Sequence, residues 1–97
     1  MFDVFVEERA EIEFYAALQY YEQLDITGLT EKFYQDYCSV IRQLEINPFF
    51  ELKIANYRGL HFDKFPFIAF FTIDESNKIV KIVSIFHSSQ DPDKYPR

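Results

Sequence analysis

The chain begins with a short apolar segment that is followed by a helical repeat. Residues 2–6 are aromatic or β-branched at every position but one, which predicts a first strand. From residue 7 the spacing of apolar side chains changes to three and four, which predicts a helix over 7–24. Its apolar positions are Phe14, Ala17, Leu18, Tyr21 and Leu24. Glutamates crowd the first turns of this helix, where the helix dipole favours negative charge.

A second helical repeat covers Leu29–Ile46. Its apolar stripe consists of Phe33, Tyr37, Val40, Ile41 and Leu44. Thr27 or Thr30 could cap its start, and Asn47-Pro48 is expected to end it because the residue before a proline disfavours the helical conformation. Only residues 25–28 separate the two predicted helices, and so short a connection predicts an antiparallel helical hairpin.

After Pro48 the pattern changes to that of strands. Apolar and charged residues alternate over 50–54, which is typical of a half-buried strand. Residues 57–62 look extended around Gly59, where we expect a bend or a bulge.

Two longer apolar runs follow. Residues 67–73 are almost continuously apolar, which predicts a central strand buried on both faces. Residues 74–78 form a polar turn, and 79–86 are predicted as a second buried strand, so the two strands should form a hairpin. The tail, residues 87–97, is polar and has no regular pattern.

The predicted order is β-α-α-β-β-β, which gives a single two-layer α+β domain over residues 1–97. The N-terminal strand and the helical hairpin should pack on one face of a mainly antiparallel sheet. Little else in the chain is left to cover the other face or an edge, so a curled sheet or a partner should hide the apolar strand 67–73.

Composition supports one folded domain. The chain has 97 residues, 48% of them hydrophobic, with 12 Phe and 7 Tyr that help a small core reach stability. The lone Cys38 excludes an intrachain disulfide and suits a reducing compartment. Residues 1–6 lack the basic segment of a signal peptide, and the chain has no apolar run long enough for a membrane span. We therefore expect a cytoplasmic protein.

Charge narrows the function classes. The net charge of −6 argues against a general nucleic-acid binder and against binding to an anionic membrane. Residues 1–51 carry 11 acidic and 3 basic side chains, whereas residues 52–97 carry 5 acidic and 7 basic ones. This division could create an acidic and a mildly basic face, or the acids could simply coat the outer side of the helices.

Most catalytic motifs are absent. Gly28 and Gly59 are the only glycines, which excludes a glycine-rich phosphate loop. Cys38 falls in the middle of a predicted helix and is expected as a small, partly buried core residue. His61 and Asp63 alternate on one strand face, which would permit a metal but is more typical of a solvated face. We predict no metal site and no cofactor.

A set of polar side chains remains near the end of the predicted sheet. Its members are Arg58, Lys64, His87, Ser88, Gln90 and Tyr95. His87 follows a buried strand, where its ring could transfer protons or could hold the tail through a hydrogen bond to the backbone. Arg58 could bind a phosphate or carboxylate, or could pair with one of the many acids, and the ion pair is the favoured interpretation.

Several short motifs occur in an order that resembles a known family. They are Tyr20-Tyr21-Glu22, Gly28-Leu29, Lys32-Phe33, Asn47-Pro48, Tyr57-Arg58, Phe65-Pro66-Phe67, Ile73-Asp74-Glu75 and the final run from His87 to Pro92. Together they resemble the RelE/ParE-like toxins of bacterial type II toxin–antitoxin modules, many of which are called plasmid stabilization proteins. The tail is most similar to the ParE-like branch, in which a His and an Asp-Pro frame a short loop.

This resemblance implies a toxin that acts by binding DNA gyrase, without catalysis and without binding DNA directly. It also implies a cognate antitoxin that neutralises the toxin. The residues expected to meet the target or the antitoxin are Arg58, Lys64, His87, Gln90 and Tyr95.

The ribonucleases of the same family imply an alternative. They cleave mRNA on the ribosome with several basic residues on the sheet face. Ile68 and Gln90 occupy two positions that are usually basic, so Arg58, His87 and Tyr95 are the remaining candidates for catalysis. Without basic side chains at positions 68 and 90, the protein would stabilise less well the negative charge that develops on the phosphate during cleavage. A ribonuclease and an inactive homologue therefore remain as alternatives to the gyrase-binding toxin.

Overall fold

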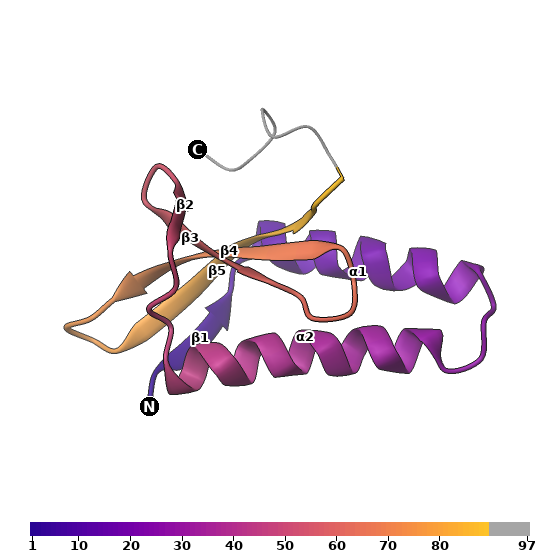
Figure 1. The fold of residues 1–97 in the computed structure, drawn as a ribbon, viewed down its shortest axis with the longest axis horizontal. Helices are drawn as coiled ribbons and strands as arrows, with labels where there is room; N and C mark the ends of the chain where they lie inside the picture. Colours follow the sequence, from indigo (N-terminus) through magenta and orange to yellow (C-terminus); the bar gives the residue numbers. More distant parts are fainter. Residues whose placement is uncertain (90–97) are drawn as a thin grey trace.

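Two helices cover one face of a five-stranded sheet in the computed structural model, which describes residues 1–89 (Figure 1). The elements are β1 Asp3–Val6, α1 Glu8–Gln23, α2 Leu29–Ile46, β2 Leu52–Ile54, β3 Tyr57–His61, β4 Phe67–Asp74 and β5 Ile79–His87. The predicted two-layer α+β architecture and its element order are confirmed, and the bounds of α2 match the prediction. No helix among the described residues combines the length and apolar character needed to cross a membrane.

The strands are ordered β1-β5-β4-β3-β2 across the sheet. β1 runs parallel to β5, and every other neighbouring pair is antiparallel. β4 therefore lies in the centre, and its residues from Phe67 to Phe71 are all buried, as its continuous apolar run predicts. β1 pairs with β5 only from Ile79 to Ile82, so within residues 1–89 the rest of β5 has no strand neighbour on that side.

The helical hairpin confirms the predicted stripe but not the predicted cap. α2 buries Phe33, Val40 and Leu44 against the sheet. Its N-cap is Gly28, at φ 80°, and no side chain caps the helix, so capping by either threonine is wrong. The left-handed backbone of this glycine lets its own carbonyl accept the first helical hydrogen bond, from Lys32 at 3.1 Å.

An aromatic cluster forms the centre of the core. The Phe33 ring, fully buried, has its centroid 5.4 Å from that of Phe14 and 5.2 Å from that of Phe65. Tyr21 and Phe67 lie 5.0 Å and 5.4 Å from the same ring. Because aromatic pairs contribute about 0.5–1.5 kcal/mol beyond their buried area, the high phenylalanine content stabilises this small domain.

A buried carboxylate holds the connection between β3 and β4. The Asp36 side chain on α2 is only 5% exposed. It accepts backbone hydrogen bonds from Asp63 at 3.1 Å, Lys64 at 2.8 Å and Phe65 at 3.1 Å. These charge-assisted bonds compensate for burial of the carboxylate and fix the turn against the helix.

The bend or bulge expected at Gly59 in β3 is not found there, and the irregularity lies in the neighbouring strand β2. Gly59 pairs regularly with Phe70, whereas the register shifts in β2 between Leu52 and Ile54. A Cβ atom on Gly59 would lie 2.6 Å from Cγ of Lys53, so the glycine provides space for the side chain at the shift.

A second, smaller apolar cluster occupies the opposite face of the sheet. It consists of Ile68, Phe70 and Phe86, which are 4%, 0% and 2% exposed, with Tyr57 and Val83 packed against it. Side chains of β4 alternate between this cluster and the main core. Both faces of the apolar strand are thus hidden from solvent within the protein itself, which answers the question that the sequence left open.

Candidate functional site

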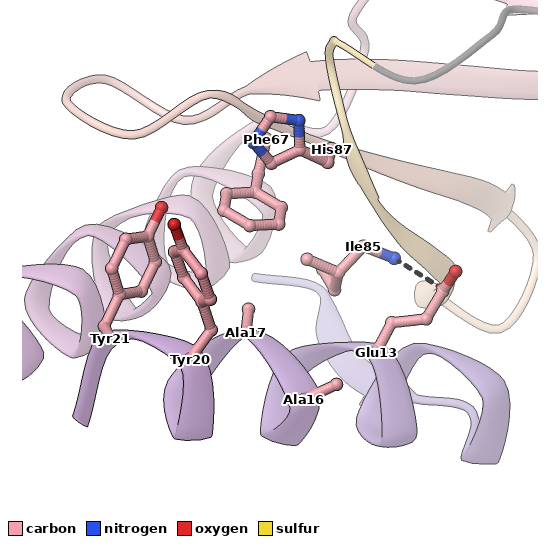
Figure 2. A pocket seen from close by; sticks show the side chains of 8 residues that line it. All are labelled: Glu13, Ala16, Ala17, Tyr20, Tyr21, Phe67, Ile85 and His87. Atoms are coloured by element: carbon pink, nitrogen blue, oxygen red, sulfur yellow. Dashed lines mark hydrogen bonds between the residues drawn. The ribbon is translucent and has the colours of Figure 1, made fainter. Parts of the chain in front are cut away.

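A pocket of about 380 Å³ lies between α1 and the ends of β4 and β5 (Figure 2). Its lining residues are Glu13, Ala16, Ala17, Tyr20, Tyr21, Phe67, Ile85 and His87.

The sequence of α1 explains the pocket's shape. Ala16 and Ala17 leave space above the sheet, and the rings of Tyr20 and Tyr21 rise one turn later as a wall. The two tyrosine rings meet edge to face at 5.4 Å. Phe67 is 6% exposed at the opposite side. Small and large side chains on one helix face therefore produce an apolar concavity with polar groups at its margin.

His87 stands at the end of β5, where the sequence places it. Its ring packs edge to face on Phe67 with the centroids 5.0 Å apart. Its Nδ1 accepts a hydrogen bond from the backbone N–H of Ser89 at 3.2 Å, and the Ser89 hydroxyl also contacts this nitrogen. In a neutral ring the proton then lies on Nε2. The backbone hydrogen bond expected for a structural role is present.

Glu13 is the second titratable group at the pocket. One oxygen of its carboxylate accepts a hydrogen bond from the Ser84 hydroxyl at 2.8 Å. The same oxygen accepts a second one from the Ile85 backbone N–H at 3.1 Å, which Figure 2 shows as a dashed line. Arg9 approaches the same oxygen at 3.8 Å. The carboxylate thus supplies a hydrogen-bond acceptor to β5 beyond the point where pairing with β1 ends.

Of the two tyrosines in this wall, Tyr21 is the more buried. Burial, and to a lesser extent the neighbouring Tyr20, raises the pKa of Tyr21 above its ordinary value. Its phenol therefore stays protonated at neutral pH and can donate a hydrogen bond, but it cannot act as a general base there.

Arg58, the favoured cation of the sequence analysis, lies away from this pocket. Its Nη1 donates to the backbone carbonyl of Phe50 at 2.7 Å, and its guanidinium lies 5.9 Å from the Phe49 ring centroid. Among residues 1–89, Arg58 therefore binds a backbone carbonyl and an aromatic face, and the favoured ion pair with an acidic side chain is not formed there. Arg58 is paired with Phe71 whereas His87 is paired with Phe67, so about 13 Å of β4 separates the two positions along the strand.

Of the other predicted site residues, Ser88 and Lys64 lie near the end of β5 and the turn before β4. Ser88 donates from its backbone N–H to the carbonyl of Pro66 at 2.8 Å, which brings the end of β5 beside the turn that contains Lys64. The Lys64 backbone binds Asp36, and its side chain lines a smaller hollow. Gln90 and Tyr95 lie outside the described residues. The structure thus brings His87 and Ser88 near the Lys64 turn and leaves Arg58 at a distance.

Three further sequence expectations concern Cys38, His61 and Asp63. Cys38 is exposed, so its expected place in the core is wrong, because it falls beside the apolar stripe of α2. His61 and Asp63 are both exposed, as expected of a solvated face. No three histidine, cysteine or acidic side chains within residues 1–89 gather in a way that would hold a metal ion.

Sequence reasoning missed three residues that organise this region. Tyr20 was noticed only as part of a motif, and Glu13 and Asp36 were not distinguished from the other acids of the helices. A helical-wheel argument could have placed Asp36, because it falls three residues after Phe33 and four before Val40 on the buried stripe. For Glu13, which lies at the border of the buried face, the sequence contains no comparable signal.

No protein-family model and no curated protein matches the chain. Among solved structures, it is similar to a chain described as "Chromosomal ParDE TA system from P. aeruginosa", with a TM-score of 0.70 and 20% sequence identity. The match covers 90% of this chain and 96% of that one. At this identity the likeness concerns the fold, and it confirms at that level the resemblance to ParE-like proteins that the motifs indicate.

Proposed function

We propose that this protein is the toxin of a type II toxin–antitoxin module, that it acts in the cytoplasm by binding DNA gyrase, and that a cognate antitoxin neutralises it. The observation that carries this proposal is the shared fold over nearly the full length of both chains with a component of a ParDE system. The ordered motifs from Tyr20-Tyr21 to the segment after His87 support it independently.

Binding is favoured over RNA cleavage by the positions of the charged groups. Cleavage needs a base, an acid and a cation close to one phosphate. The guanidinium of Arg58 is engaged with Phe50, far along the sheet from His87. Ile68, at a position that is basic in the ribonucleases, is buried in an apolar cluster. These positions support a toxin that acts through contact with a protein.

The pocket beside α1 is the proposed antitoxin site. Its concave wall would receive an apolar side chain of the antitoxin, with His87 and Tyr20 available for polar contacts. The part of β5 that β1 leaves unpaired lies beside it, so an extended antitoxin segment could also run along this edge.

The target is tested by adding the purified protein to a gyrase supercoiling reaction and, separately, to a translating ribosome. We expect inhibition of supercoiling and intact mRNA. Primer-extension stops at defined codon positions, abolished by His87→Ala, would establish the ribonuclease instead. Inhibition of neither reaction would indicate an inactive homologue.

The antitoxin site is tested with the protein encoded by the adjacent reading frame. Ala16→Trp fills the pocket from an exposed helix position, so it should prevent neutralisation while leaving growth arrest intact. Glu22→Trp, exposed on the same helix and outside the pocket lining, is the matched control and should still be neutralised. Normal neutralisation of Ala16→Trp would remove the pocket from the proposal.

A further inference from the structure

The outer side of the helical hairpin presents a group of tyrosines that the proposed antitoxin site does not use. Tyr15 on α1 is 55% exposed and Tyr34 on α2 is 53% exposed. Both rings contact the buried ring of Phe14, with centroids 5.5 Å and 6.4 Å away. Tyr37 lies half-buried beside Tyr34 at 6.4 Å. Because the core holds one side of these rings, their free faces form a fixed aromatic surface.

An apolar hollow continues this surface. It has a volume of about 290 Å³ and is lined by Leu18, Thr30, Glu31, Tyr34 and Gln35. Tyr34 belongs to both features, so the hollow and the tyrosines form one area, which we call the outer hairpin face. A hollow of this size accommodates one large aliphatic side chain.

The charge of the outer hairpin face is negative. Glu31 lines the hollow, and Glu11 lies close enough to Tyr37 to disfavour its ionised form. Burial, the Cys38 thiol and this carboxylate together raise the pKa of Tyr37 to about 12. Of the basic side chains on the two helices, Arg9 approaches Glu13 at 3.8 Å, and Lys32 lines a separate, smaller hollow together with Asp36 and Asp63.

The outer hairpin face and the antitoxin pocket lie on different sides of α1. Glu11, Tyr15 and Leu18 follow one stripe of the helix, and each precedes a pocket residue, Glu13, Ala17 or Tyr20, by two positions. Two positions correspond to about 200° around the helix axis, so the two stripes are nearly opposite. Occupation of the pocket therefore leaves the outer hairpin face accessible.

We propose that the outer hairpin face docks a helix of a partner protein that carries arginine next to large aliphatic side chains. The aliphatic side chain enters the hollow beside Leu18 and Tyr34. The guanidinium stacks on an exposed tyrosine ring and pairs with Glu11 or Glu31, an arrangement for which arginine is better suited than lysine. Charge complementarity selects this occupant, since an acidic or neutral helix would gain only the apolar contact.

The probe is a synthetic amphipathic helix with leucine and arginine on one face, titrated into the full-length protein and followed by fluorescence anisotropy. We expect binding that weakens several-fold when arginine is replaced by lysine and is lost when it is replaced by glutamate. Tyr34→Ala should weaken binding by about tenfold, and Glu31→Gln should weaken it several-fold. Glu75→Gln, in the exposed turn after β4, removes the same charge elsewhere and should leave binding unchanged.

Equal weakening by Glu75→Gln and Glu31→Gln would show nonspecific attraction and overturn the proposal. So would binding that neither Tyr34→Ala nor Glu31→Gln affects. Concentration-dependent dimerisation of the protein alone, abolished by Tyr34→Ala, would assign the face to a second copy of the chain instead. If Tyr34→Ala lowers the melting temperature, Glu11→Gln combined with Glu31→Gln, two changes that leave the rings in place, decides the matter.

Discussion

The carboxylate of Glu13 accepts the backbone N–H of Ile85 at 3.1 Å, although 72 positions separate the two residues in the chain. The bond joins α1 to β5 beyond Ile82, where pairing with β1 stops. A strand that loses its neighbour leaves backbone donors without a partner, and a side chain from the helix above supplies the acceptor here. The pocket beside α1 lies directly next to this junction, since Glu13 and Ile85 both line it.

Glu13→Ala should lower the free energy of unfolding by about 1–3 kcal/mol, because it leaves the Ile85 amide and the buried Ser84 hydroxyl without their acceptor. Glu13→Gln keeps an oxygen acceptor and should cost less. Urea denaturation measures both variants, and hydrogen exchange of the Ile85 amide should accelerate only in the alanine variant. Equal stability of the wild type and Glu13→Ala would contradict this role.

Asp36→Ala should destabilise the protein by about 3 kcal/mol, since three backbone donors of the β3–β4 turn lose one buried acceptor. The matched control is Asp63→Ala, in which an exposed carboxylate of the same turn is removed, and it should change stability by about 0.5 kcal/mol or less. Thermal and urea unfolding provide the comparison. Similar losses in the two variants would refute a special role for Asp36.

Gly59→Ala should cost about 1–3 kcal/mol because the new methyl group would meet Cγ of Lys53 at 2.6 Å. Lys53→Ala removes this atom, so the double variant should recover most of the loss. A double-mutant cycle measured by urea denaturation tests the coupling between the two positions. Additive effects would show that strain at Gly59 has another origin, such as contact with Ile68.

Arg58→Ala should lower stability by about 1–3 kcal/mol through loss of the bond to the Phe50 carbonyl and of the contact with Phe49. If the residue is only structural, growth arrest should persist at temperatures well below melting. Growth and melting are therefore measured on the same variant. Abolished growth arrest with an unchanged melting temperature would place Arg58 in the toxic surface instead.

The pH dependence of stability should carry a contribution from Tyr37. Its folded pKa is about 12, above the ordinary value of 10.0, so the folded state keeps a proton that the unfolded state releases between these values. The contribution is fully present below pH 10 and is lost as pH rises toward 12. Tyr37→Phe should therefore show a smaller fall in melting temperature between pH 9 and 11 than the wild type. Absorbance at 295 nm, which follows tyrosinate, should lose its most alkaline component in the variant, and identical titrations would contradict the assignment.

Local pattern was sufficient for the secondary structure. Apolar residues recur every second position in a strand and every third or fourth position in a helix, because these side chains lie on the buried side of the element. Such a repeat can be recognised within a short segment, as in Leu29–Ile46, without knowledge of the rest of the fold. The continuous apolar run of residues 67–73 is equally local. The start of α2 was predicted at the right residue but with the wrong cap, because Gly28, with a left-handed backbone, occupies the N-cap position and neither threonine does.

Tertiary structure alone decided what the polar side chains do. From the sequence, Arg58 had many possible acidic partners and His87 had several possible roles. In the fold, the Arg58 guanidinium meets the Phe50 backbone carbonyl, and the His87 imidazole accepts the Ser89 backbone amide. Glu13 and Asp36 resemble the other helix acids in composition, yet each binds a backbone segment far away in the chain. Hydrophobic burial is non-directional and follows a local period, but a hydrogen bond needs its two groups within about 3 Å and correctly oriented, and only the assembled fold determines which groups meet.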